Sequence, residues 1–194
     1  LTLSGTHDYR GGTVIDGGII HAMVTVALGS GPVSVNQGSL SFLNSASAGS
    51  LVIANGGGGI LFGGRSTAGT STITNHEQRW IDFRDQASAG QATITNRGGT
   101  FFYGSSTAGS AAISNAGGGV YFDSSSNAGT ARITNTSGIV GFYGAASAGN
   151  AFILNGLDGQ GGTVGFYGSN TADEATIVNG VGARVDISDL ASDG

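Results

Sequence analysis

The chain has 194 residues, of which 38 are Gly and none is Cys, and it carries seven Arg, no Lys and twelve acidic residues. A net charge of −5 with no basic stripe argues against nucleic-acid binding, because nothing gathers positive charge to neutralise phosphates. The lack of Cys excludes disulfides and thiolate metal sites, and no apolar run is long enough for a membrane-spanning helix.

Short β-branched runs broken by glycine turns fill residues 1–41. Residues 13–20 and 33–40 are two such runs, twenty positions apart, interrupted by Asp-Gly-Gly and Asn-Gln-Gly. We expect Asp16 and Asn36 to take the turn position that Asn occupies in later coils. This part of the chain therefore predicts roughly two irregular coils.

A fourteen-residue unit then recurs seven times between residues 42 and 179. Each copy begins at Phe and ends at Asn thirteen positions later, while the step from Asn to the next Phe varies over 7, 8, 6, 7, 7 and 11 positions. A unit that varies only at one join and recurs about every 20 residues indicates one coil of a β-solenoid. The copies are residues 42–55, 62–75, 83–96, 102–115, 122–135, 142–155 and 166–179.

Period-two alternation assigns each strand an inner and an outer face. Each Phe and the residue two positions before it are expected inside. In the second strand we expect Ala111 and Ile113 inside, with Ala112 and Ser114 outside. The position of Gly109 is Gly in six copies and Asp173 in the seventh, which predicts a positive φ there.

Stacked coils place equivalent residues in columns. The Asn column can pass amide hydrogen bonds from coil to coil, or each Asn can satisfy its own turn; both interpretations stay open. The predicted structural ladder consists of Phe42, Phe62, Phe83, Phe102, Phe122, Phe142 and Phe166, with Asn55, Asn75, Asn96, Asn115, Asn135, Asn155 and Asn179.

Outward aromatic residues are the strongest candidates for a binding surface. Tyr103, Tyr143 and Tyr167 each follow a Phe of the repeat, and residues 76–85 break the pattern with Trp80, the only Trp, and Arg84. Exposed rings in register suit a sugar or a partner protein. Alternatively, the rings form cross-coil pairs that only stabilise the solenoid.

The sequence contains no recognisable catalytic motif, and we predict no catalytic residue, cofactor or metal. The three His residues fall in different coils. Asp82 and Asp123 are two coils apart, about 9–10 Å, near the upper limit for an inverting glycosidase pair. A carbohydrate-active β-helix is therefore one alternative function.

Two phrases near the start resemble a known family. Residues 1–18 read LTLSG, then YRGGTVIDGG, and residues 27–40 read ALGSGPVSVNQGSL; together with the later STAG-x-A-x-ITN units they resemble passenger-associated transport repeats of bacterial autotransporters. The resemblance implies a right-handed parallel β-helix exported to the cell surface through an outer-membrane barrel that this chain does not contain. It implies no particular activity.

The expected fold is all-β: a single right-handed parallel β-helix over residues 1–194, about 20 residues per coil and roughly nine coils. Residues 1–41 form irregular coils, 42–179 the seven repeats and 180–194 a C-terminal strand and tail. The expected function is a structural or adhesive stalk rather than an enzyme, binding a host or bacterial surface glycan or protein. A further alternative is a filament subunit that stacks head to tail on copies of itself, because neither end shows a capping element.

Overall fold

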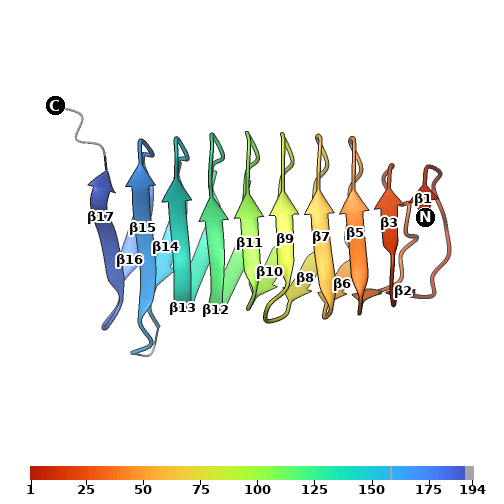
Figure 1. Ribbon diagram of the computed structural model, residues 1–194, viewed down its shortest axis with the longest axis horizontal. Helices are drawn as coiled ribbons and strands as arrows, with labels where there is room; N and C mark the ends of the chain where they lie inside the picture. Colours follow the sequence, from red (N-terminus) through yellow and green to blue (C-terminus); the bar gives the residue numbers. More distant parts are fainter. Residues whose placement is uncertain (158, 191–194) are drawn as a thin grey trace.

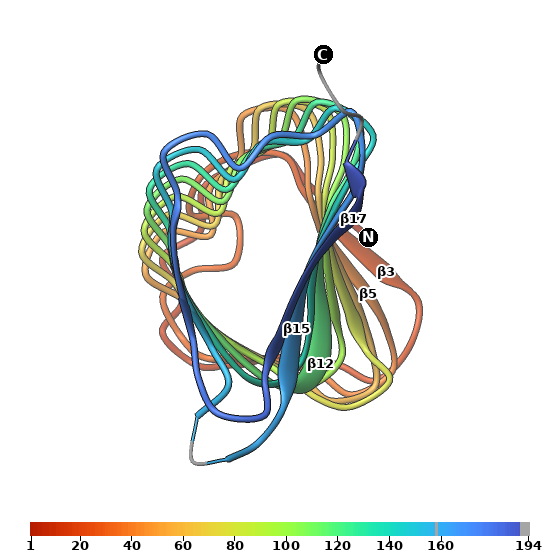
Figure 2. The ribbon, with the colours of Figure 1, turned by 90° about the vertical axis from the view of Figure 1, so that its left-hand side faces the viewer.

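The computed structural model describes residues 1–157 and 159–190, and it is a parallel β-solenoid of about 9 turns with about 20 residues per coil. The prediction of the fold is confirmed. The front strands rise as the chain advances from right to left (Figure 1), and the end-on view shows the chain crossing the top from right to left (Figure 2). This path is a right-handed coil.

One side of the solenoid is the front sheet, whose strands pair in parallel with strands of the coils before and after them. Glycine or a turn precedes most of these strands, and an apolar alternation fills them. They are β1 (Thr2–Leu3), β3 (Ile19–Ala22), β5 (Gly38–Phe42), β7 (Gly58–Phe62), β9 (Trp80–Phe83), β11 (Gly99–Phe102), the later parts of β12 (Ala112–Phe122) and β13 (Arg132–Tyr143), β15 (Gly162–Gly168) and β17 (Arg184–Leu190).

A second sheet forms the next side, again with parallel pairing only. β12 and β13 begin in this sheet and continue around the corner into the front sheet, with a register shift after Asn115. The other members are β2 (Thr13–Ile15), β4 (Val33–Val35), β6 (Val52–Asn55), β8 (Thr72–Asn75), β10 (Thr93–Asn96), β14 (Phe152–Asn155) and β16 (Thr176–Asn179).

A line of single parallel bridges closes the third side, from Ser47↔Thr67 to Ser147↔Thr171. Two residues after each bridge the backbone turns sharply. Gly109 has φ 61° there and Asp173 has φ 45°. The predicted positive φ is confirmed, and it explains why this corner accepts only residues that tolerate a left-handed backbone.

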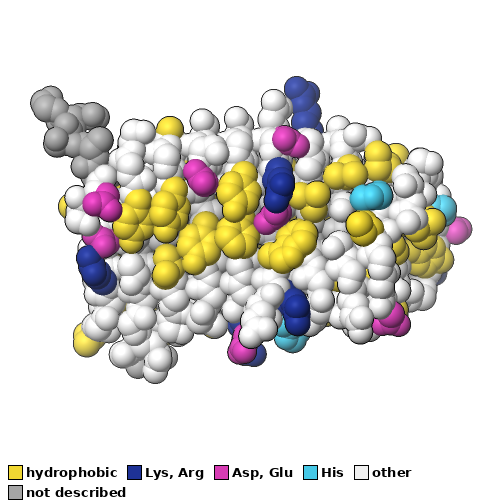
Figure 3. Space-filling model, in the orientation of Figure 1, with side chains coloured by type: hydrophobic (Ala, Val, Ile, Leu, Met, Phe, Trp, Pro, Cys, Tyr) yellow, Lys and Arg dark blue, Asp and Glu magenta, His cyan; other side chains and the backbone are white. Residues whose placement is uncertain are grey.

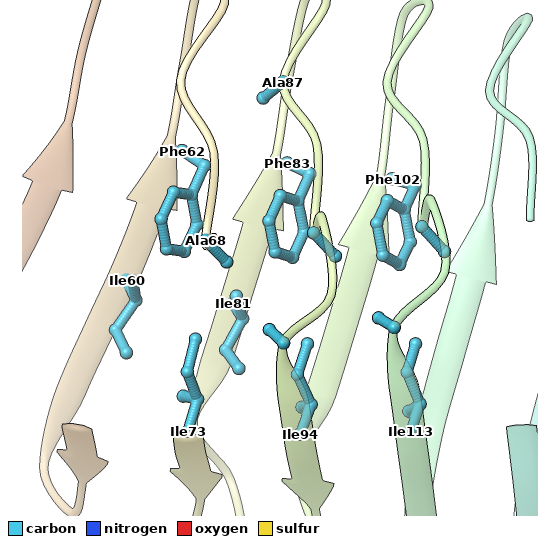
Figure 4. Close-up of a cluster of buried hydrophobic side chains, with 14 of the residues drawn as sticks. Ile60, Phe62, Ala68, Ile73, Ile81, Phe83, Ala87, Ile94, Phe102 and Ile113 are labelled. Carbon is cyan, nitrogen blue, oxygen red and sulfur yellow. The ribbon is translucent and has the colours of Figure 1, made fainter. Parts of the chain in front are cut away.

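Columns of identical side chains fill the interior (Figure 4). The seven Phe rings form a continuous stack with centroid separations of 4.6–4.9 Å and interplanar angles of 5–9°. Ile113 and Ala111 are buried while Ala112 is exposed, as the alternation predicts. The core is therefore a repeat of one packing layer rather than a single central cluster.

The buried Asn residues form a hydrogen-bonded ladder beside the Phe stack. Each side-chain Nδ2, from Asn55 to Asn155, donates to Oδ1 of the next Asn at 2.7–2.9 Å. The same nitrogen also donates to a turn carbonyl; Asn115, for example, donates to Gly118 O at 2.9 Å. The two interpretations of this column thus describe one arrangement, in which the amide holds its own turn and fixes the next coil in register.

The first coils depart from the expected alignment. Val35, not Asn36, pairs with Asn55, and Ile15 pairs with Val35. Asn36 and Asp16 are exposed and bond each other at 2.7 Å. The prediction that these two residues take the Asn-ladder position is wrong, because the strand register shifts them by one residue to the outside. The tail at 191–194 lies outside the described residues.

Candidate binding surface

Six aromatic side chains form a band across the outer face of the front sheet, over five consecutive coils. We call this band the aromatic strip. It appears as a nearly continuous apolar patch on the face shown in Figure 3. Its members are on or directly after β9, β11, β12, β13 and β15: Trp80, Phe101, Tyr103, Tyr121, Tyr143 and Tyr167.

Glycine makes room for these rings. A Cβ added at Gly141 would lie 2.6 Å from the ring of Tyr143, and one added at Gly165 would lie 2.3 Å from Oη of Tyr167. Gly99 and Gly119 stand in the same relation to Phe101 and Tyr121. In each case the glycine is two residues before the aromatic residue, on the same face of the strand. The ring therefore leans back over a bare stretch of backbone.

The rings of neighbouring coils also contact one another. Tyr143 and Tyr167 stack at 5.0 Å, and Phe101 and Tyr121 stack at 5.2 Å, both with an interplanar angle of 21°. The rings of Tyr121 and Tyr143 are tilted relative to each other, with their centroids 6.3 Å apart. Aromatic pairs at these separations contribute about 0.5–1.5 kcal/mol beyond area burial, so the strip stabilises the solenoid whether or not it binds a ligand.

One ion pair flanks the strip. Arg84 donates through Nη2 and Nε to Oδ2 of Asp82, at 2.6 and 3.1 Å, and its guanidinium carbon lies 5.7 Å from the centroid of the Tyr103 ring. The Asp82 side chain is 9% exposed, whereas that of Arg84 is 56% exposed. The pair therefore presents mainly its cationic member to solvent.

Two tyrosine phenols of the strip, those of Tyr103 and Tyr143, have a pKa above the usual value and stay neutral at physiological pH. Partial burial raises the pKa of Tyr103 above its usual value, and the negative charge of Asp82 adds to this effect. Partial burial likewise raises the pKa of Tyr143, and the neighbouring Tyr167 and Tyr121 raise it further. The strip offers aromatic rings and hydroxyl groups, which suit ligands with both apolar and hydrogen-bonding parts.

A shallow groove of about 760 Å³ lies at the Trp80 end of the strip. The groove lies where two neighbouring turns differ in length. The step from Asn75 to Phe83 spans eight positions, and the next step, from Asn96 to Phe102, spans only six. The longer turn contains Gln78 and Arg79, which line one side of the groove. The floor beside it consists of glycines, among them Gly98, Gly99 and Gly118.

The structure gathers the predicted surface residues on one face, but it also adds two that the sequence analysis did not include. Phe101 and Tyr121 belong to the column just before each Phe, whereas Tyr103, Tyr143 and Tyr167 belong to the column just after it. The sequence signal for these two was a Gly-x-aromatic pattern shared with Tyr143 and Tyr167.

The carboxylates considered for catalysis are held apart. Asp82 pairs across the sheet with Phe101, which pairs with Tyr121, so Asp123 is two coils further on and in a different column. Asp82 is bound to Arg84, and Asp123 accepts a hydrogen bond from the amide of Ser124. Among the described residues no group of three or more His, Cys, Asp or Glu is placed to hold a metal. Within the same residues, no helix has the length and apolarity needed to cross a bilayer.

Comparisons with protein-family models, with curated proteins and with solved structures find no match to this chain.

Proposed function

We propose that this chain is a non-enzymatic binding stalk: a rigid solenoid that presents the aromatic strip to a glycan or protein on a cell surface. The observation that carries the proposal is the pairing of four of the six rings with a glycine two residues earlier, as at Gly141 and Tyr143. Six rings on one face form an apolar patch with polar rims, which marks interaction sites in soluble proteins.

The likeness of residues 1–40 to autotransporter passenger repeats supports a location for this stalk. In this proposal the chain is part of an exported passenger that reaches the bacterial surface through an outer-membrane barrel. The solenoid then serves as a spacer, and the strip as its adhesive part.

Binding to an array of surface glycans and proteins tests the proposal, with Tyr121→Ala and Tyr143→Ala as the test variants. Each lost ring should weaken binding by about 0.5–1.5 kcal/mol, roughly two- to tenfold. Phe152→Ala on the second sheet is the matched control, because Phe152 is also an outward aromatic residue. The proposal fails if the Tyr variants lose stability but change no binding, or if Phe152→Ala weakens binding equally.

A further inference from the structure

The groove at the Trp80 end of the strip gathers positive charge in a chain that is otherwise acidic. Three of the seven Arg residues, Arg79, Arg84 and Arg97, line it, while the only acidic lining residue is Asp82. Because Asp82 is already paired with Arg84, the charge of Arg79 and Arg97 is not balanced by a salt bridge within the described residues. The groove is cationic although the chain carries a net charge of −5.

Neither Arg79 nor Arg97 forms a salt bridge with the coil among the described residues. Arg97 is exposed. Arg79 has a buried Nε that finds no hydrogen-bond partner in the structure. A buried guanidinium nitrogen without an acceptor costs free energy, and an incoming carboxylate would satisfy it with the bidentate geometry that Arg favours.

The remaining walls suit a ring-shaped polar ligand. The indole of Trp80 lies over Gly59 of the preceding coil, and the residue is 37% exposed. Six of the sixteen lining residues are glycines, so a ligand can approach the backbone closely. An aromatic wall, a bare floor and several cationic side chains in the lining are features of a small-ligand site.

From this arrangement we propose that the groove is the anionic subsite of the strip and that it binds the carboxylate of an acidic sugar in a linear glycan. The sugar ring contacts Trp80 and the carboxylate contacts Arg79 and Arg97. The rest of the glycan runs along the strip toward Tyr143 and Tyr167. This inference rests on the proposed binding function and adds the class of ligand.

A short oligogalacturonate and its fully methyl-esterified form are the matched probes, because esterification removes the carboxylate charge and leaves the sugar backbone intact. The intact chain should bind the acid about tenfold more tightly than the ester, as expected of a charge-assisted hydrogen bond. Arg97→Gln should remove most of this preference by weakening binding of the acid much more than binding of the ester. Calorimetry measures all of these affinities, and raised salt should narrow the difference.

Arg132→Gln is the control, because Arg132 belongs to the second sheet and stacks on Phe152. It should leave the acid preference intact. Equal affinity for acid and ester, or no effect of Arg97→Gln and Arg79→Gln on the acid preference, would overturn the inference. The proposed function would still stand in that case if the chain binds the ester and Tyr143→Ala weakens this binding. A polyglutamate peptide that binds as tightly as the oligogalacturonate would also overturn it, since the groove would then recognise charge rather than a sugar. If neither sugar and no member of the array binds, both proposals are refuted.

Discussion

The outer faces of the two sheets carry different chemistry, although the strands of both sheets bury repeated columns of side chains. On the front sheet, rings lean over glycines and stack from coil to coil. On the second sheet, the outward positions of β8 and β10 are Thr72, Thr74, Thr93 and Thr95, followed further along by Arg132 over Phe152. The inward columns therefore define the coil, and the outward columns are free to specialise.

The largest effect should come from the interior that both faces share. Ile113→Ala removes a buried side chain from the second sheet and should lower the free energy of unfolding by about 2–5 kcal/mol through cavity formation. The outward control Thr74→Ala should change it by no more than about 0.5 kcal/mol. Urea unfolding measures both, and similar losses in the two variants would refute the division into inner and outer columns.

The next largest loss of stability should come from the Asn ladder. Asn115 accepts from Asn96 and donates to Asn135, Gly118 and Ile139. Asn115→Ala orphans buried polar groups at about 1–3 kcal/mol each. The matched substitution Asn36→Ala, at an exposed pair in the first coils, should cost much less. If the two variants unfold at the same urea concentration, the ladder does not hold the coils in register.

The tight corner should respond more moderately. Gly109 has a positive φ, and a Cβ there would lie 2.7 Å from the backbone oxygen of Gly90. Gly109→Val should therefore cost about 1–3 kcal/mol from backbone strain, and more than Gly109→Asn. Asp173, which occupies this corner in the seventh repeat, shows that a short polar side chain is accommodated. Thermal melting of the two variants side by side tests this order, and a Val variant as stable as the Asn variant would contradict it.

The smallest stability effect should come from the front face itself. Gly141→Ala places a methyl group against the Tyr143 ring, which can swing outward because it is the end of a side chain at the surface. Unfolding should change by no more than about 1 kcal/mol, but near-ultraviolet circular dichroism of the tyrosines should change and ligand binding should weaken. Ala112→Val, an outward enlargement on the second sheet, should leave both signals intact. Unaltered spectra and binding in Gly141→Ala would show that the glycine does not position the ring.

The repeat alone was enough to predict the coil, the buried columns and the positive φ at Gly109, because each depends on spacing and alternation. It failed at Asn36, where a one-residue shift of register moves the side chain from the ladder to the surface. Periodicity measures distance along the chain and cannot detect such a shift where the repeat is imperfect.

The strip was predictable only in part for a different reason. Outward positions identified Tyr103, Tyr143 and Tyr167, and the break in the repeat at residues 76–85 identified Trp80 and the neighbouring Arg84. Phe101 and Tyr121 belong to another column and join the strip because their side chains lean along the strand. The groove depends on the difference in length between two neighbouring turns and on the direction of Arg79 and Arg97. The direction of a side chain and the shape of a turn depend on the three-dimensional structure, and the residue types in one column of the repeat do not specify them.

Fluorescence of Trp80 during titration with oligogalacturonate is the most direct test that the front face, and not the second sheet, binds the ligand. Trp80 is the only Trp in the chain and lies at the groove, so its emission reports that site alone. We expect a saturable change in emission and weaker acrylamide quenching, with the same dissociation constant as calorimetry gives. Calorimetric binding that leaves the emission and quenching of Trp80 unchanged would contradict the assignment of the aromatic strip as the binding surface.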